Sequence, residues 1–411
     1  MEAELRVSTL IRTACVTAML GLLPFGAIVV VGATGRADSR LDITDFHAFY
    51  LVGQAILSGH VAEVYDTGHL FPMEVALGGR QVLMPWSYPP PFGLLVAGLA
   101  LMPLAAAYLA FTAGTLALYL WATARLAGEA RWPVILASFV SIVLNLRCGQ
   151  NGLLTAGIVA LGAAALVERA SLRAGGWLGA MVIKPHLVLV LPVWLALQRR
   201  WAVLAGAACV ALALTAGSTM VLGIEVLPAF WQSLSDVGHM MSSGVFPLYR
   251  MTSVFACLLS LGVSPGLAVL LHGAVALIVL GFVAQAWTRS GDMRLTLGLA
   301  IMAGLFISPY VYDYDLPVFG VGLMLAAPAL QQRLSVARYK ALLVGFAAAQ
   351  APGFLLTPIG AWYHGHLVAP MGPLLLSVFG VIVYSVLTSS AVVTEATVPV
   401  DRAHPGDLVT G

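Results

Sequence analysis

Residues 251–288 read MTSVFACLLSLGVSPGLAVLLHGAVALIVLGFVAQAWT and contain no aspartate, glutamate, lysine or arginine. A membrane-spanning helix needs about 20 apolar residues, so this run is long enough for two such helices. Similar runs follow one another along the chain and predict repeated membrane crossings. They lie at 13–35, 81–124, 132–146, 148–167, 201–224, 295–312, 316–332 and 341–394.

The overall composition points the same way. Hydrophobic residues make up 60% and charged residues 9% of the chain, and the mean hydropathy is +0.95. Soluble domains have about 45–50% apolar and about 25% charged residues, so an ordinary soluble protein is excluded. We predict an all-α polytopic membrane protein with about 10–13 transmembrane helices. The net charge is only +2, and the lysines and arginines occur singly or in pairs rather than in a basic patch. This pattern predicts membrane lipids as surroundings and no nucleic-acid partner.

The runs predict one transmembrane domain at 1–392, followed by a disordered polar tail at 393–411. Two longer connections interrupt the domain, a first external loop at 34–90 and a second at 223–250. Each carries apolar residues at helical spacing, which predicts helices lying in the membrane interface. These stripes are Phe46, Phe49, Tyr50, Gly53, Ile56 and Leu57, with His47 opposite, and Phe230, Trp231, Leu234, Val237 and Met241.

The basic residues predict the orientation of the chain. Lysine and arginine favour the cytoplasmic side, so Arg6 and Arg12 place the amino terminus inside and the acidic first loop outside. The clusters at 125–131 and 169–173 do not fit a strict alternation of complete crossings. The short apolar piece 91–102, bounded by prolines, is a candidate for an incomplete crossing.

Charged groups inside or beside apolar runs cost free energy in a membrane and are therefore functional candidates. Asp45 opens the predicted helix of the first loop, where it could also simply favour the helix dipole. Lys184 lies in Ile183-Lys184-Pro185-His186, within the window 174–198, which is apolar except for Lys184 and His186 and which we expect to be a membrane span carrying polar groups. It is about ten residues, or roughly 15 Å, from either end, too far to reach the interface easily. This position predicts a functional lysine.

Two further motifs place polar side chains between apolar runs. Ser308-Pro309-Tyr310-Val311-Tyr312-Asp313-Tyr314-Asp315 contains an Asp-x-Asp pair, or alternatively an aromatic belt with two hydrated acids. Residues two apart point to different sides of a helix, so we expect no metal between these carboxylates. Arg147-Cys148-Gly149-Gln150-Asn151-Gly152 is either a polar site or only a tight turn.

Five motifs, in order over nearly the whole chain, resemble glycosyltransferase family 87. This family of the GT-C superfamily includes polyprenol-phosphate-mannose-dependent alpha-1,2-mannosyltransferases. The motifs are Asp45-Phe46 with Tyr50, Tyr88-Pro89-Pro90-Pro91-Phe92, Gly149-Gln150-Asn151, Lys184-Pro185, and Ser308-Pro309-Tyr310 with Tyr314-Asp315.

The resemblance implies a GT-C-like helix bundle with a first-loop acid near the reaction centre. It implies transfer of mannose or another hexose from a polyprenyl-phosphate-linked donor to a lipid or glycan acceptor, outside the cell membrane and without a cofactor. The family's mannosyltransferases usually have a histidine in the last motif, where this chain has Tyr314-Asp315. The identity of the base therefore stays open between Asp45 and Asp315.

Such a transfer needs a base for the acceptor hydroxyl and cations for the leaving phosphate. We prefer Asp45 as the base and expect Asp315 to line the same cavity. The phosphate-binding candidates are Lys184, Arg147 and Arg80, and the substrate-binding candidates are Tyr50, Tyr88, Gln150, Asn151, Tyr310 and Asp313. The alternative is a transporter or lipid flippase, although the sequence shows no duplicated halves with paired broken helices.

Overall fold

The computed structural model describes residues 2–32, 44–78, 83–243, 246–362 and 367–388. Within these ranges every regular element is a helix, and the one β-type pairing is an isolated antiparallel bridge between Met251 and Tyr312. Arg80 and the tail predicted at 393–411 lie outside the described residues.

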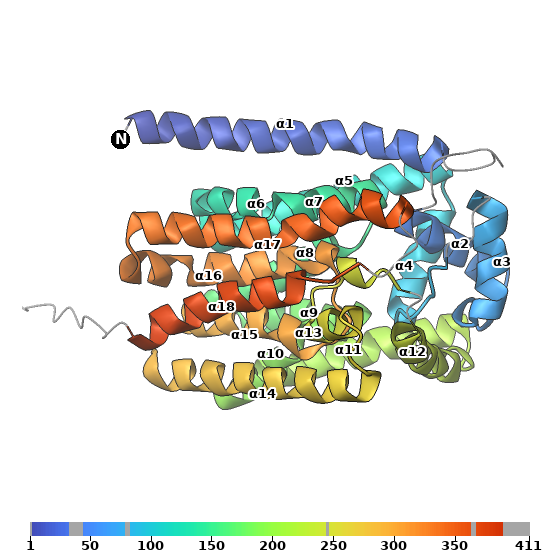
Figure 1. Cartoon of the computed structure of the whole chain (residues 1–411). Coiled ribbons are helices and arrows are strands. Elements are labelled where there is room, and N and C mark those ends of the chain that lie inside the picture. Colours follow the sequence, from blue (N-terminus) through green and yellow to red (C-terminus); the bar gives the residue numbers. More distant parts are fainter. Residues whose placement is uncertain (1, 33–43, 79–82, 244–245, 363–366, 389–411) are drawn as a thin grey trace, which may run out of the picture.

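Six helices in the described part are long and apolar enough to cross a membrane. Figure 1 shows the long helices running alongside one another. They are α1 (Glu2–Gly32), α5 (Leu104–Ala127), α11 (Trp201–Leu222), α14 (Pro265–Arg289), α17 (Val336–Trp362) and α18 (Met371–Thr388). Shorter helices complete the bundle, namely α6 (Trp132–Ala137) after η2 (Gly128–Arg131), α7 (Phe139–Cys148), α8 (Gly152–Val167), α15 (Met293–Ile307) and α16 (Pro317–Arg333). The chain is an all-α polytopic membrane protein.

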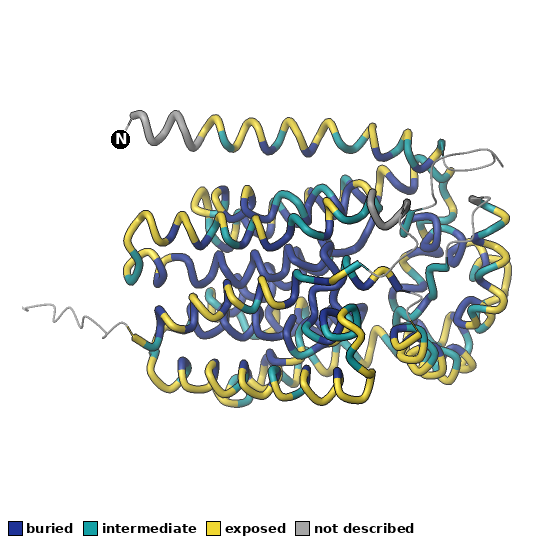
Figure 2. Tube along the Cα trace, viewed as in Figure 1, coloured by how far each residue is buried: buried dark blue, intermediate teal, exposed yellow. Residues whose placement is uncertain are grey.

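The centre of the bundle is formed by helices that are apolar on all sides. Helices α8, α15 and α16 bury almost every residue, and Figure 2 shows this buried core running through the middle of the molecule. The outer helices α11 and α14 instead expose large apolar side chains such as Leu212, Met220 and Leu277. Exposed apolar helix faces suit a hydrocarbon environment rather than water.

One end of the bundle gathers arginines from several helices. The carboxylate of Glu168 forms ion pairs with Arg125 and Arg173, each with an N–O distance of 3.0 Å. Arg294 donates a hydrogen bond to the carbonyl of Leu126. We call this surface the basic end and define it by Arg125, Arg173, Arg200 and Arg294.

The apolar window 174–198 is a broken hairpin rather than the continuous span that we expected. Its backbone leaves the helical path at Lys184, where φ is −153° and ψ is 65°. The following Pro185 explains the break, because proline lacks an N–H and disfavours helical backbone in the residue before it. The hairpin consists of α9 (Ser171–Gly179), η3 (Ala180–Ile183), η4 (Pro185–Val188) and α10 (Val190–Leu197).

A second apolar piece also fails to cross. Helix α4 (Pro90–Ala100) has 11 residues, about 16 Å of helix, which is too short for a hydrocarbon core of about 30 Å. Met102, two residues after the end of this helix, accepts a hydrogen bond from Tyr50 of the first loop, so the chain is still on the side of that loop. Because α4 does not cross, the end of α5 lies beside the start of α1, where Arg12 pairs with Glu129. The hairpin in turn brings Arg200 back to the end that carries Arg173.

The end opposite the basic end carries the loop helices. Helices α2, α3 and α12 lie across it in Figure 1. On the predicted polar side of α2, Gln54 and Ser58 are exposed. His47 is instead fully buried, and its Nε2 lies 2.9 Å from the carbonyl oxygen of Val30. The elements at this end are α2 (Asp45–Leu57), η1 (Glu63–Tyr65), α3 (Thr67–Gly78), α12 (Val226–Ser242), η5 (Leu248–Arg250), α13 (Val254–Ser260) and η6 (Asp313–Asp315).

Candidate active site

A cavity of about 1190 Å³ lies between the loop helices and the ends of the bundle helices. Its wall includes the start of α2, the segment 83–89, the turn between α7 and α8, the hairpin tip, the second loop and the segment 308–314. Its charged side chains, within the described part of the chain, are one acid and three bases. These are Asp45, Arg147, Lys184 and Arg250.

Asp45 is held by a rigid start of α2. It is the first helical residue, and Thr44 and His47 on either side bond to each other through the Thr44 N–H and the His47 Nδ1, 2.9 Å apart. Phe46 is fully buried and packs edge-on against Tyr108. The Asp45 side chain forms no ion pair with any described residue and lines the cavity. Its carboxylate is therefore available to a substrate.

The turn after α7 is required by close packing against α2. Gly149 has φ of +67°, and a Cβ atom at this position would lie 2.5 Å from the Cβ of Phe46. Only glycine meets both demands without strain. This turn directs Arg147 and Gln150 into the cavity wall. The tight turn and the polar site, which the sequence offered as alternatives, are thus compatible.

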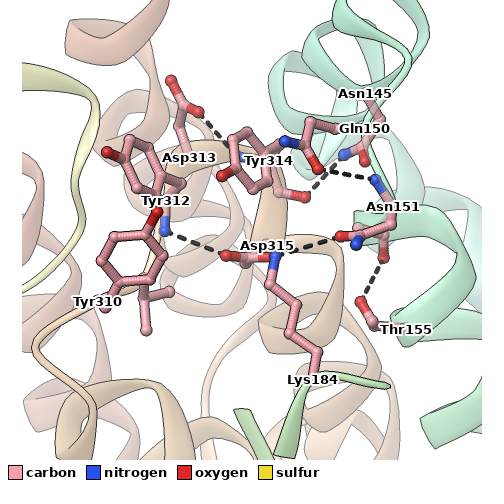
Figure 3. A network of polar contacts seen from close by, with 12 residues as sticks. Asn145, Gln150, Asn151, Thr155, Lys184, Tyr310, Tyr312, Asp313, Tyr314 and Asp315 are labelled. Carbon is pink, nitrogen blue, oxygen red and sulfur yellow. Dashed lines mark hydrogen bonds and ion pairs between the residues drawn. The ribbon is translucent and has the colours of Figure 1, made fainter. Parts of the chain in front are cut away.

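Lys184 forms a buried ion pair at the hairpin tip. Its Nζ lies 2.6 Å from Oδ1 of Asp315 and 3.2 Å from Oδ1 of Asn151, and it stands 4.8 Å from the ring centre of Tyr314 (Figure 3). The two charged side chains are only 3% and 1% exposed. A charge this deeply buried needs such a partner, and the pairing explains the lysine in an apolar segment.

The Asp-x-Asp pair is divided between two cations. Asp315 binds Lys184, whereas Asp313 accepts two hydrogen bonds from Arg250, at 3.1 Å from Nε and 3.0 Å from Nη2. Figure 3 shows the two carboxylates pointing in different directions, as their spacing predicted.

Residues 86–309 match the family model for glycosyltransferase family 87. The match covers more than half of the chain. The chain belongs to glycosyltransferase family 87. No curated protein and no solved structure matches it. The matched region includes Arg147, Lys184 and Arg250, while Asp45 precedes it and η6 follows it. This protein is therefore a membrane glycosyltransferase, whose donor and acceptor must meet within reach of a base.

Most of the residues predicted for the site of this glycosyltransferase do line one cavity. They come from five separate segments of sequence, which the fold brings together. They are Asp45, Tyr88, Arg147, Gln150, Lys184 and Tyr310.

The remaining predicted residues lie elsewhere. Tyr50 is turned away from the cavity, because its hydroxyl donates a 2.8 Å hydrogen bond to the carbonyl of Met102. Asn151 and Asp315 lie behind Lys184 and hold its ammonium rather than forming the wall. Asp313 likewise lies behind Arg250 and holds its guanidinium. We expected Asp315 to line the cavity beside Asp45. It lies behind the cavity wall instead and contacts Lys184, which lines the cavity.

Arg250 is the cavity residue that our sequence analysis of this family 87 enzyme missed. We read it only as the end of the second loop. It is the single lysine or arginine between Arg200 and Arg289, standing immediately before a long charge-free run. That isolation was the available signal, because an ionisable group beside an apolar run is a functional candidate by default.

Proposed function

We propose that this glycosyltransferase moves a hexose, such as mannose, from a polyprenyl-phosphate-linked donor to a lipid or glycan acceptor on the outer side of the cell membrane. The observation that carries the proposal is the charge pattern of the cavity. Among the described residues, Asp45 is the one carboxylate that shares the cavity wall with Arg147, Lys184 and Arg250. A glycosyl transfer from a phosphate donor needs both a proton acceptor and positive charge for the departing phosphate.

In the proposed reaction the acceptor hydroxyl oxygen attacks the anomeric carbon of the donor sugar. Its proton passes to the carboxylate of Asp45 while the bond between the anomeric carbon and the phosphate oxygen breaks. The polyprenyl phosphate leaves with the electron pair of that bond. Asp45 is the base in this scheme because the other two acids of the site, Asp313 and Asp315, are each bound to a cation.

Arg147 and Lys184 are the proposed partners of the leaving phosphate. The guanidinium of Arg147 forms no ion pair with a described residue and is exposed at the cavity wall. Lys184 faces the same cavity, with its charge balanced by Asp315. Such fixed donors stabilise developing negative charge without reorganising during the reaction. Arg80 stays a candidate for the same role from the sequence.

The sugar and the prenyl chain require different surroundings. Tyr88, Gln150 and Tyr310 offer hydroxyl and amide groups for sugar hydroxyls. Helix α12 contributes an apolar part of the wall through Phe230, Val237 and other side chains, which suits a hydrocarbon chain. The basic end favours the cytoplasm, and this supports an outer position for the cavity at the opposite end.

The test is Asp45→Asn in the purified full-length protein with a polyprenyl-phosphate hexose as donor. We expect turnover to fall roughly 100-fold or more, the scale for loss of a general base, with the thermal unfolding temperature preserved. Asp66→Asn is the matched control, because Asp66 is an exposed acid of the same loop outside the cavity wall. Near-normal turnover in Asp45→Asn would remove Asp45 from the base role.

A further inference from the structure

Arg250 presents a guanidinium whose hydrogen-bonding capacity is only partly used. Its side-on pairing with Asp313 engages Nε and Nη2, at 3.1 and 3.0 Å. A guanidinium has five N–H donors, so three are left over, including both on Nη1. Within the described residues no other hydrogen bond of Arg250 accounts for them. The side chain is 14% exposed and lines the cavity, whereas Asp313 is fully buried beneath it.

The backbone on both sides fixes this guanidinium in place. Thr252 donates its N–H to the carbonyl of Val311 at 2.8 Å, and Met251 forms the isolated antiparallel bridge with Tyr312. The guanidinium carbon also stands 5.6 Å from the ring centre of Tyr314. The end of the second loop is therefore joined to the segment that carries Asp313. An arginine held in this way is ordered before any ligand arrives, which lowers the entropic cost of binding.

The remaining donors match a tetrahedral anion. Planar guanidinium groups bind two phosphate oxygens at once through parallel N–H bonds, which lysine cannot do. Asp45 and Arg250 line the same cavity, so a phosphate at Arg250 shares that cavity with the proposed base. Lys184 has fewer hydrogen-bond donors available to a phosphate, because it is 3% exposed and already bound to Asp315 and Asn151.

We propose that Arg250, oriented by Asp313, is a binding site for the phosphate group of a lipid substrate. The inference rests on the proposed function for the nature of the substrates. Two phosphates share the required chemistry, the phosphate of a polyprenyl donor and the phosphodiester of a phospholipid acceptor. In the first case Arg250 holds the leaving group. In the second it positions the acceptor.

The experiment measures binding rather than transfer, so that it does not depend on turnover. The detergent-solubilised full chain is titrated with undecaprenyl phosphate and, separately, with phosphatidylinositol. Undecaprenol and diacylglycerol are the uncharged controls. The variants are Arg250→Lys and the double variant Arg250→Gln/Asp313→Asn, which keeps a neutral hydrogen-bonding pair in place of the ion pair. Arg125→Gln is the matched control, because it removes an arginine from an ion pair at the basic end.

We expect the double variant to bind one of the two phospholipids roughly 10- to 100-fold more weakly, the effect of losing hydrogen bonds to a charged group. Arg250→Lys should lose less, and binding of the uncharged lipids should not change. Weaker binding of undecaprenyl phosphate identifies the donor phosphate as the ligand, and weaker binding of phosphatidylinositol identifies the acceptor. Wild-type affinity of both variants for both lipids would overturn the site.

These outcomes are separable from failure of the proposed function. A chain that binds undecaprenyl phosphate through Arg250 but transfers no sugar would overturn the transfer reaction and support the site. Thermal unfolding of each variant shows whether it is folded. Arg250→Lys keeps the charge beside Asp313, so it tests the bidentate geometry even where the double variant is unstable.

Discussion

Asp313 and Asp315 stand two residues apart in η6, and each binds a cation from a distant segment. The pair of Asp315 with Lys184 is closed off, with side chains 1% and 3% exposed. In the pair of Asp313 with Arg250, the acid is equally buried but the arginine is 14% exposed and reaches the cavity. In the closed pair, most of the hydrogen-bond donors and acceptors are bound to other groups of the protein. The open pair keeps donors for a ligand.

The difference shows how one short segment can serve both structure and chemistry. Breaking a buried ion pair costs about 3–5 kcal/mol, because the remaining charge is left without a partner in a medium of low dielectric. Replacing both partners costs much less. Mutation of the closed pair should therefore affect stability as well as transfer, and single and double variants can separate these two contributions.

The largest effect is expected from Lys184→Ala, which leaves the carboxylate of Asp315 buried without its cation. We expect a loss of about 3–5 kcal/mol of stability, together with loss of transfer. Lys184→Arg should recover part of the transfer. Stability is measured by thermal unfolding in detergent, and transfer with a polyprenyl-phosphate hexose.

The double variant Lys184→Ala/Asp315→Ala decides between structure and chemistry. We expect its unfolding temperature to recover while its transfer does not, because the phosphate still lacks a cation. Recovery of both would make the lysine purely structural. Failure to recover either would mean that the hairpin tip depends on the pair for its position.

A smaller effect is expected at Glu74, a buried acid of α3 that has no ion pair with any described residue. Burial, together with the nearby charge of Asp45, raises the pKa of Glu74 to about 8, although a hydrogen bond from the Met84 N–H opposes this rise. The unfolded chain gives up this proton near the ordinary pKa of 4.5. Stability should therefore fall as the pH rises from about 4.5 to about 8, by a few kcal/mol at most.

The variant Glu74→Gln cannot ionise, so it should lack this part of the pH dependence. We expect it to unfold at a higher temperature than the wild type at pH 8.5 and at nearly the same temperature at pH 4.5. Thermal unfolding at these two pH values is the measurement. Equal pH dependence in both proteins would show that Glu74 has a cationic partner in the folded state.

The smallest effect is expected from metal removal. Each carboxylate of the Asp-x-Asp pair is bound to its own cation, so chelation of a metal by both would require two ion pairs to break. We expect transfer by the wild type to be unchanged in EDTA. Loss of transfer in EDTA with rescue by magnesium or manganese would show that a metal displaces Lys184 or Arg250 during the reaction.

The sequence predicted the parts of this fold that depend on local pattern. The charge-free runs mark the helices, and the spacing of Asp313 and Asp315 correctly placed them on different sides. The break at Lys184 was not predicted, because an apolar window of this length fits a continuous span as well as a hairpin. A continuous span and a hairpin differ in which helices pack against α9 and α10, and in the structure these helices are α8, α11 and α15.

The site was predicted less completely than the fold, since its contacts are distant in sequence. Lys184 was recognised from its apolar surroundings, but its pairing with Asp315 spans 131 positions that no local pattern connects. Tyr50 was misplaced because helical spacing defines a face without saying what lies against it. Arg250 has no motif at all, and its role depends on Asp313, 63 positions later.

The separation between Lys184 and Asp315 also sets an order of events during biosynthesis. Chains grow at about 5–20 residues per second, so the 131 positions correspond to roughly 7–26 s in which the lysine exists before its carboxylate has been made. A lone ammonium is costly in the bilayer centre. We therefore expect the hairpin tip to reach its final position only after η6 has been made, and the nascent chain to keep this lysine near water until then.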